Sequence, residues 1–470
     1  MHRKRFRIAL VACCLCATLP GGLRADTIDD YVTAEMARRH IPGVALTVVR
    51  NGRIERVQGY GFANLEHQVP MHPDTLFKTG AVGMQFTAVA VMLLVEEGKI
   101  GLDDSVRKYL PNTPRSWQPI TIRNLLNHTS GLPATPGGEF LVEYTDDSLL
   151  AVISKLPLNY PAETRWRFSF SDYIVLGFIM DTVTGDHYTK FLARRLFGPL
   201  NMRTAQPIDD LAVIPNRAAG YEMVEGAPRN PPSVSAFATS TADGSLYLSA
   251  LDYAAWASGG LGRTVLKPES WAHIAQAAHL KSGRSYPYGF GWFQQGDSGH
   301  ALWQHSGSWQ GFQAAIASYP GDDLTLVVLA NGSDADPAGM IRNVATLLDP
   351  KFRQAPGAPI ADTEPHITGT FRMLLGQIAE GSEDKADFVD FSQRDFTDMM
   401  TMYRATLKPL GALAEVALFG RGMLGDDRLY RYRARYEKGA IDVRLGFAPN
   451  GRIGTLELMP VDDWTAPLQE

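Results

Sequence analysis

Cysteine is almost absent from this sequence. The chain has 470 residues and three cysteines, Cys13, Cys14 and Cys16, all within its first 25 residues. If that segment is removed, the protein has no disulfide, no thiol nucleophile and no cysteine-held metal. No His-Glu-x-x-His spacing is present either, so we expect neither a metal nor another cofactor.

Positive charge is also scarce. The formal net charge is −5, from 45 basic and 50 acidic residues. The first 25 residues hold five Lys or Arg and no acid, which leaves 45 − 5 = 40 basic residues against 50 acidic ones, or −10. No basic stripe is evident, which argues against nucleic acid and anionic lipid as partners. A small molecule or an oligosaccharide is the expected ligand.

The chain has one long apolar run outside its globular part, from Ile8 to Leu19, and it is too short to span a bilayer comfortably. Basic residues precede it, and Leu23-Arg24-Ala25 fits a cleavage site. Residues 1–25 are therefore predicted to be a secretory signal, which would place the protein in the periplasm or outside the cell. An N-terminal anchor helix and a lipoprotein box at residues 10–13 remain alternatives.

Turn and strand signals occur near both ends of the next part of the chain, residues 26–348. Two β-branched runs, 44–49 and 54–57, flank Asn51-Gly52, which is typical of a hairpin. The runs 314–318 and 324–330 predict a second hairpin. Between these hairpins, residues 81–97 form a buried helix that Gly98 ends. The pattern predicts an α+β fold in which terminal strands pair in one antiparallel sheet.

A second domain is expected after residue 365. Residues 349–365 are rich in Pro, Ala and charge and are predicted to be a linker between residues 26–348 and a small α+β domain at 366–470. In that domain, residues 430–436 alternate between Tyr or Ala and Arg, which predicts a half-buried strand. Its basic face either binds an acidic ligand or is a solvated surface, and the second interpretation is favoured.

Five segments in order resemble the serine β-lactamase and penicillin-binding-protein family, of the class C type. They are residues 75–111, TIRNLLNHTSGLP at 121–133, ADGSLYLSALDYAAW at 242–256, YGFGW at 288–292 and HSGSWQGF at 305–312. The resemblance implies an antiparallel sheet flanked by helices, an all-helical subdomain, and an active site between them. It also implies a nucleophilic serine, a lysine one helical turn later and a tyrosine from a second loop.

The same alignment indicates that this machinery is lost. The Ser-x-x-Lys positions read Ala81-Val82-Gly83-Met84, and the tyrosine falls at Phe168 or, in a second register, at Phe170. Only His305-Ser306-Gly307 resembles the third element. Loss of one member of such a unit typically costs on the order of a million-fold in turnover, so catalysis by another serine, Ser171 or Ser306, is the least favoured hypothesis.

Two functions remain. The first is a repurposed glycoside hydrolase-like enzyme with carboxylates as acid and base, for which two carboxyls roughly 5 to 10 Å apart would be needed. Its candidate catalytic residues are Asp172, Asp243, Glu139 and His305, with Glu143 near Glu139. The second is a pseudoenzyme that binds a peptidoglycan fragment, peptide or glycan. In either case the candidate ligand contacts are Trp166, Phe170, Trp303, Ser306, Trp309 and Phe312.

Each candidate also has a structural interpretation. Asp243 would stabilise a turn, Asp172 would cap a helix, and the glutamates would be surface charges. The aromatic residues would fill the core. Two acids facing each other across one pocket would favour the enzyme, and their absence would favour the binding protein.

Overall fold

The protein is described by a computed structural model over residues 22–137, 141–224, 226–235, 241–297, 299–353 and 357–461. Most of the predicted signal, residues 1–21, lies outside this part. Within it, no helix is long and apolar enough to cross a membrane.

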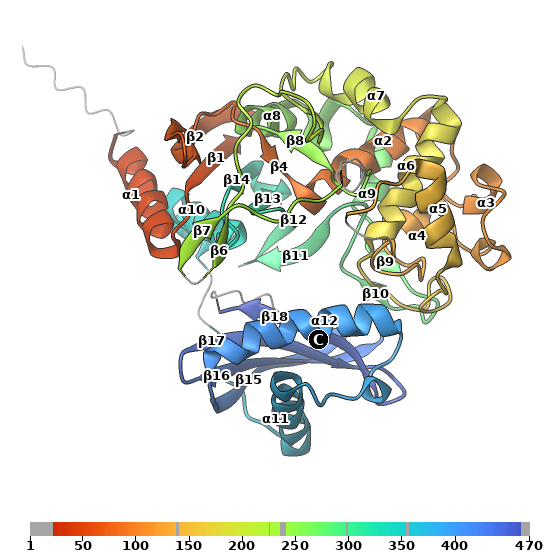
Figure 1. Ribbon diagram of the computed structural model, residues 1–470, viewed down its shortest axis with the longest axis vertical. Coiled ribbons are helices and arrows are strands. Elements are labelled where there is room, and N and C mark those ends of the chain that lie inside the picture. The colour runs from red at the N-terminus through yellow and green to blue at the C-terminus, as the bar shows by residue number, and fades with distance from the viewer. Residues whose placement is uncertain are drawn as a thin grey trace, which may run out of the picture.

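A seven-stranded sheet forms the centre of the first domain (Figure 1). Its order is β11-β12-β13-β14-β1-β2-β3, and all the pairs are antiparallel. The strands are β11 (Phe293–Asp297), β12 (His300–Trp309), β13 (Phe312–Tyr319), β14 (Leu324–Ala330), β1 (Gly43–Arg50), β2 (Arg53–Asn64) and β3 (Val69–Pro70). β1 pairs with β14, with Thr47 opposite Val327, so the predicted union of the terminal strands is confirmed.

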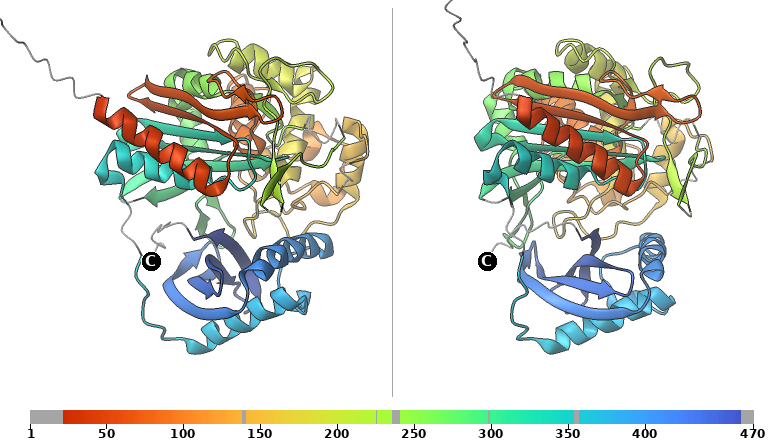
Figure 2. Two further views of the ribbon diagram at one scale, coloured as in Figure 1. Left: turned by 60° about the vertical axis from the view of Figure 1, so that its left-hand side comes forward. Right: turned by 90° about the vertical axis from the view of Figure 1, so that its left-hand side faces the viewer.

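Helices cover both faces of this sheet. On one face, α1 (Gly22–Arg39) and α10 (Pro337–Leu348) lie side by side (Figure 2) and share a core with inward residues of β1 and β14. On the other face lie α8 (Ala250–Ala255) and α2 (Met84–Glu96). Helix α2 is buried on every side from Met84 to Leu94, and Gly98, with φ +69°, follows its end, as expected.

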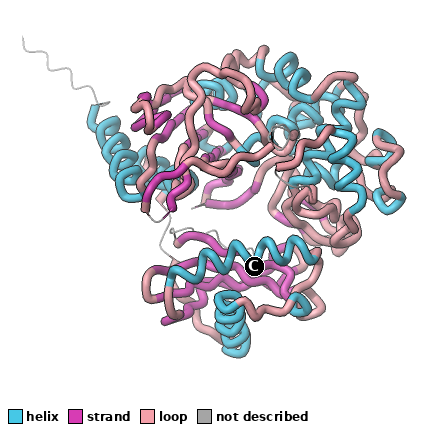
Figure 3. Tube along the Cα trace, in the orientation of Figure 1, coloured by secondary structure: helices cyan, strands magenta, loops and turns pink. Residues whose placement is uncertain are grey.

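The remaining helices of this domain gather beyond one end of the sheet (Figure 3). They are α3 (Val106–Tyr109), α4 (Ile122–Leu126), α5 (Asp146–Lys155), α6 (Phe170–Thr184), α7 (Tyr188–Leu192) and α9 (Pro268–Ile274). Short strands form β4-β8-β5 (Phe77–Lys78, Leu246–Leu248, Gln206–Pro207), β6-β7 (Glu222–Val224, Ala227–Arg229) and β9-β10 (Ala278–His279, Ser285–Tyr286). The 3-10 turn η1 (Gly80–Gly83) leads into α2.

The C-terminal domain lies beside the β11 edge of the large sheet (Figure 1). Its antiparallel sheet has the order β15-β16-β17-β18, formed by Leu413–Leu424, Asp427–Tyr436, Gly439–Phe447 and Ile453–Pro460. Helices α11 (Pro365–Glu380) and α12 (Gln393–Leu407) pack on the face that carries Tyr430 and Tyr432. The predicted alternation of β16 is present, because Tyr430, Tyr432 and Ala434 are buried while Arg431 and Arg433 are only partly so.

Candidate functional site

Two pockets open on either side of Ala81. They share Ala81, Phe170 and Ser308. The larger, of about 560 Å³, is bounded by η1, the end of β12, the start of α10 and strands β17 and β18 of the C-terminal domain. The smaller, of about 180 Å³, lies among η1, the start of α6, residues 241–245 and α12. Together they form one cleft, which we call the Ala81 cleft.

Glycines bring the backbones of η1 and β12 into direct contact at the centre of this cleft. A Cβ on Gly307 would lie 2.3 Å from the Thr79 carbonyl oxygen and 2.7 Å from Ala81 N, and Gly80 has φ +53°. No larger side chain fits between the two segments. Ala81 is therefore held at the cleft wall, where its methyl group is the whole of its side chain. Met84, three residues later, has no exposed surface.

Residues 161–170, which contain the position of the family's tyrosine and which we call the second-motif loop, place two phenyl rings in the cleft. Ser169 caps α6 by accepting a hydrogen bond from Asp172 N at 3.3 Å, so Phe168 precedes the helix and Phe170 begins it. Both rings line the larger pocket, and Phe170 also lines the smaller one. Whichever of Phe168 and Phe170 occupies the position of the family's tyrosine, the cleft holds a phenyl ring that lacks the tyrosine hydroxyl.

His305 lines the larger pocket, but both of its ring nitrogens are occupied. Nδ1 lies 2.8 Å from the Ser306 carbonyl oxygen, which can only accept, so Nδ1 carries the proton. Nε2 then accepts from the Tyr288 hydroxyl at 3.2 Å. Burial lowers the pKa of His305 to about 4, so the ring is neutral near pH 7. This arrangement does not suit the general-base role that the sequence suggested.

Asp172 is not in the cleft, contrary to expectation. It is fully buried at the first turn of α6, where it accepts hydrogen bonds from Ser130 Oγ and, at 2.8 Å, contacts His128 Nδ1. Burial raises the pKa of the Asp172 carboxyl well above its usual range and lowers that of His128 well below its own. The pair therefore joins the segment that follows α4 to the start of α6, and neither residue lines the cleft. Ser171 is equally buried.

Asp243 does reach the cleft. It lines the smaller pocket and is partly buried, and its Oδ1 accepts from Thr241 Oγ1 at 2.7 Å. Burial raises the pKa of the Asp243 carboxyl to about 6. Hydrogen bonds from Thr241, from the backbone of Asp243 itself and from Ser245 act in the opposite direction, but their effect is smaller. Asp243 both supports a turn, since Gly244 follows with φ +117°, and presents a carboxyl that is partly protonated near neutral pH.

The other candidates divide between the cleft and the core. Ser306 and Trp309 line the two pockets. Trp166 stacks on Tyr286 with ring centroids 3.8 Å apart, Trp303 packs near Trp292, and Phe312 is buried against Phe77, so none of these three lines either pocket. Their large apolar area is more stable inside the protein. Glu139 lies outside the described residues, and Glu143 is exposed and lines neither pocket.

The contribution of the C-terminal domain was missed from the sequence. Asp442, Arg444, Glu457 and Met459 line the larger pocket, and Arg394 and Asp398 of α12 line the smaller one. The alternation of polar residues along the strands indicated an exposed face. It did not indicate that this face lies against the first domain.

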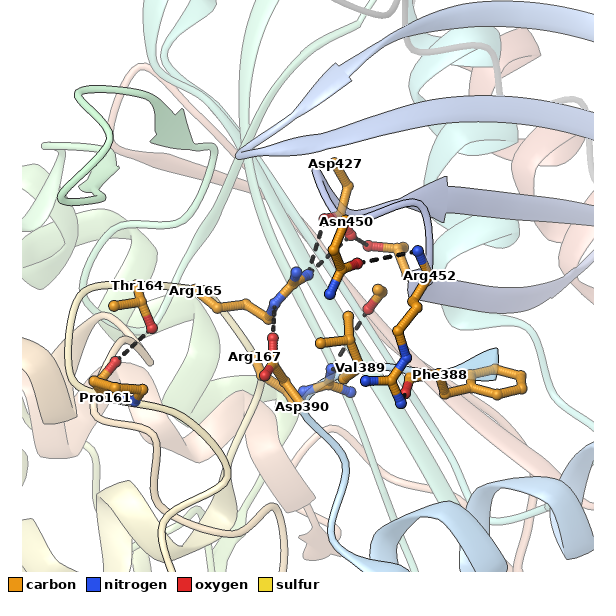
Figure 4. Close-up of polar contacts among 12 residues, drawn as sticks. Pro161, Thr164, Arg165, Arg167, Phe388, Val389, Asp390, Asp427, Asn450 and Arg452 are labelled. Carbon is orange, nitrogen blue, oxygen red and sulfur yellow. Dashed lines mark hydrogen bonds and ion pairs between the residues drawn. The ribbon is translucent and has the colours of Figure 1, made fainter. Parts of the chain in front are cut away.

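Two arginines of the second-motif loop attach the C-terminal domain (Figure 4). Arg165 donates from Nε to Asp390 at 2.7 Å and from Nη1 to both oxygens of Asp427 at 2.9 and 3.0 Å. Arg167 lies over the Phe391 ring, 3.5 Å from its centroid. Since Phe168 follows Arg167 directly, these contacts also hold the cleft side of the loop in place.

One group in the described part of the chain has the geometry to hold a cation. Asp146, Asp181 and His187 each offer a ligand atom, and these atoms lie within 4.8 Å of one another. None of them lines either pocket. Asp146 is only partly buried, and we assign this group no role in the cleft.

Comparison with known proteins matches residues 28–349 to the family model described as Beta-lactamase. Protein flp of Staphylococcus aureus (strain MW2) is 27% identical over 318 residues, which cover 65% of this chain and 62% of that protein. The putative penicillin-binding protein PbpX of Bacillus subtilis (strain 168) is 28% identical over 297 residues, covering 63% of this chain and 72% of that one. The chain thus matches about three fifths of the length of Protein flp.

Solved structures agree on the fold. The octameric penicillin-binding protein homologue from Pyrococcus abyssi superposes with a TM-score of 0.61 at 20% identity, covering 93% of this chain and 96% of that one. The D-amino acid amidase from Ochrobactrum anthropi SV3 gives 0.58 at 20% identity, covering 69% of this chain and 98% of that one. Both carry the architecture predicted from the five segments.

Proposed function

Since the chain belongs to the beta-lactamase family, we propose that it is a ligand-binding member that uses the family's cleft without serine acyl transfer. The observation that carries this proposal is the pair Ala81 and Met84. The first lines the cleft and the second is fully buried behind it, so a methyl group and a thioether occupy the positions where the family resemblance implies a hydroxyl and an amine.

No other side chain restores the missing chemistry in the described part of the cleft. No lysine lines either pocket there. Three serines line the pockets. Ser306 and Ser308 are exposed, and the nearest imidazole, His305, has both nitrogens engaged. Ser245 is partly buried, and its hydroxyl donates to Asp243 Oδ1 at 3.4 Å. A nucleophile needs a base within hydrogen-bond reach, and in the described part of the cleft we find none beside Ser306 or Ser308.

What remains suits recognition. The Ala81 cleft combines phenyl rings with serine hydroxyls and the side-chain amides of Gln295, Gln304 and Gln313. An apolar wall with a few polar groups that fix orientation is typical of a binding site. A Cβ on Gly80 would lie 2.7 Å from Ser308 N, so the backbone just before Ala81 lies close to that of Ser308, and we expect the backbone amides there to receive a carbonyl or carboxylate oxygen of the ligand.

The ligand is proposed to be a peptide, peptidoglycan fragment or glycan. The predicted signal segment favours the periplasm or the exterior of the cell as the place where the protein meets it. The names of PbpX and of the Pyrococcus abyssi homologue as penicillin-binding proteins, and of the D-amino acid amidase, point to ligands of cell-wall or D-amino acid type.

Two measurements test this proposal. The protein is incubated with benzylpenicillin and with a fluorophosphonate, and its intact mass is expected to stay unchanged. It is then titrated calorimetrically with muropeptides, short peptides and neutral oligosaccharides. Ser308→Trp, which fills the point shared by both pockets, is expected to abolish binding, whereas Ser282→Trp, on an exposed turn outside the cleft, is expected to leave it intact. A covalent adduct, or binding insensitive to Ser308→Trp, would overturn the proposal.

A second candidate function rests on Asp243. A carboxyl whose pKa is raised to about 6 is suited to donate a proton to a leaving group, as the acid of a glycoside hydrolase does. Asp398 of α12 lines the same pocket and would be the second carboxylate. Oligosaccharide cleavage that Asp243→Asn abolishes would establish this function, and binding of the same sugars without products would exclude it.

A further inference from the structure

Three helices of the first domain bring metal-ligating side chains together outside the Ala81 cleft. Asp146 is the first residue of α5, Asp181 lies in the last turn of α6, and His187 immediately precedes α7. Their ligand atoms all lie within 4.8 Å of one another. Helix α6 packs against both α5 and α7 (Figure 1), so the three residues meet where the ends of these helices converge. We call Asp146, Asp181 and His187 the three-helix cluster.

Asp181 is placed where a carboxylate is costly. The residue is partly buried, and its Oδ1 atom has less than 1 Å² of exposed surface and, within the described residues, no hydrogen-bond partner. It also lies at the end of α6, where the helix dipole disfavours negative charge. A buried carboxylate oxygen without a partner is destabilising. A cation bound beside this oxygen would remove the cost.

In the described part of the chain, the groups around Asp181 do not supply that cation. Asp146 is a second carboxylate, and burial together with the charge of Asp146 raises the pKa of Asp181 to about 7. Lys190 and Arg194, which follow in the chain, pair instead with Asp186, at 3.3 and 3.6 Å. Two neighbouring acids without a basic partner break a local rule, and natural sequences do so mainly at functional sites.

His187 is in the state that a metal ligand needs. Burial lowers the pKa of its imidazole, so the ring is neutral near pH 7 and a nitrogen lone pair is available for coordination. The Nδ1 atom lies 2.8 Å from Thr189 Oγ1. A hydrogen bond at one ring nitrogen commonly orients a histidine whose other nitrogen binds a metal.

The ligand set points to a transition-metal ion. Two carboxylates and one imidazole form a mixed oxygen and nitrogen set, which Zn²⁺ binds with bond lengths of about 2.0 to 2.2 Å. The ligand atoms of such an ion lie about 3 to 4 Å apart, so small side-chain rotations would complete the shell. Ca²⁺ and Mg²⁺ prefer oxygen ligands alone. Asp146 is only partly buried, so water can reach the remaining coordination position.

We propose that the three-helix cluster binds one Zn²⁺ or similar transition-metal ion, which joins the start of α5 to the ends of α6 and α7. The proposal is independent of the proposed function, because none of the three residues lines either pocket. It has a consequence for the cleft. Tyr144, just before α5, and Leu149, within it, line the smaller pocket, so the bound ion holds that wall in place.

The first test measures binding of the ion itself. The protein is dialysed against EDTA and then into metal-free buffer, and is titrated calorimetrically with ZnCl₂, MgCl₂ and CaCl₂. One tight Zn²⁺ site per chain is expected, with an affinity at least tenfold above that for Mg²⁺ or Ca²⁺. Asp181→Asn is expected to weaken Zn²⁺ binding about a hundredfold, because even the loss of a group that only orients a ligand costs roughly 10- to 100-fold.

Asp147→Asn is the matched control. Asp147 follows Asp146 in the first turn of α5, is exposed and does not belong to the cluster, so the affinity of this variant for Zn²⁺ is expected to equal that of the wild type. If Asp181→Asn fails to fold, Asp146→Asn takes its place, because it removes another ligand of the cluster at a more accessible position.

Stability provides a second measurement. An ion that binds only the folded state stabilises it by mass action, so saturating Zn²⁺ is expected to raise the Tm of the wild type and of Asp147→Asn, but not that of Asp181→Asn. Without metal, Asp181→Asn is expected to resist urea at least as well as the wild type, because it removes one of two neighbouring negative charges. Zn²⁺ is also expected to slow amide hydrogen exchange in α5.

Each contrary result overturns a stated part of the proposal. Wild-type Zn²⁺ affinity in Asp181→Asn and Asp146→Asn would show that the ion binds elsewhere. Tighter binding of Mg²⁺ or Ca²⁺ than of Zn²⁺ would overturn the class of ion. Hydrogen exchange in α5 that bound Zn²⁺ leaves unchanged would overturn its role at the pocket wall. Binding of none of the three ions at millimolar concentration would overturn the site, whereas the proposed function would stand.

Discussion

Arg165 Nη1 lies 2.9 Å from Asp427 Oδ1 and so joins the second-motif loop of one domain to the start of β16 in the other. The side chain of Asp427 is 2% exposed and that of Arg165 is 12% exposed. A charge pair this buried gives little net stability when intact, but removing one partner leaves a charge in the interior without compensation.

We therefore predict that Arg165→Ala destabilises the protein by about 3 kcal/mol. Urea denaturation followed by tryptophan fluorescence measures this. Arg435→Ala is the control and should change stability by less than about 0.5 kcal/mol, because its pair with Glu415 is exposed on both sides. Equal effects of the two variants would show that the loop is not anchored through Arg165.

Restoring the nucleophile alone is not expected to restore acyl transfer. Ala81→Ser would place a hydroxyl at the cleft wall, but Met84 and Phe168 supply neither a base nor a proton relay. Intact-mass measurement after exposure to benzylpenicillin should show no adduct for Ala81→Ser, and none for Ala81→Ser with Phe168→Tyr. Rapid acylation of the single variant would mean that another group already serves as base.

Asp243 makes stability depend on pH in a defined direction. Its pKa is about 6 in the folded protein and 3.8 is its usual value, so the folded state holds the proton more tightly. The stability from this group is fully present below about pH 4 and is lost as pH rises through 6. Relative to wild type, Asp243→Asn should gain roughly 2 kcal/mol between pH 4 and pH 7, measured by urea denaturation at both values. A constant difference would contradict the raised pKa.

His305 acts in the opposite direction. Its folded pKa of about 4 lies below the usual 6.5, so its contribution is present above pH 6.5 and is lost as pH falls through 4. By NMR, its ring is expected not to titrate between pH 5 and pH 8. Tyr288→Phe should cost about 1 to 3 kcal/mol because Nε2 loses its donor inside the protein. A His305 resonance that titrates near pH 6.5 would refute the neutral, doubly engaged ring.

Gly307 is predicted to tolerate no side chain. In Gly307→Ala the new Cβ would meet backbone atoms at 2.3 to 2.8 Å, and backbone has little freedom to move aside, so we expect a loss of about 2 kcal/mol or more. Gly321→Ala, where a Cβ meets nothing within 4 Å, should be close to neutral in the same thermal denaturation assay.

The sequence alone determined the architecture of the first domain. Turn signals at Asn51-Gly52 and around Pro320, β-branched and apolar runs beside them and one uniformly apolar helix are local features, and they predicted β1, β2, β13, β14 and α2. It also determined what is missing, because a methyl at residue 81 and a thioether at residue 84 need no coordinates to be identified. Both follow from the identity of the residues and their near neighbours.

Tertiary structure decided which of the candidate side chains can meet a ligand. Asp172 and Asp243 looked alike in the sequence, yet packing of α6 against α4 buries the first and leaves the second at the pocket wall. Arg431 and Arg444 are 13 residues apart, and only strand register brings them face to face. Burial and register depend on contacts between residues far apart in the chain, which local patterns do not encode.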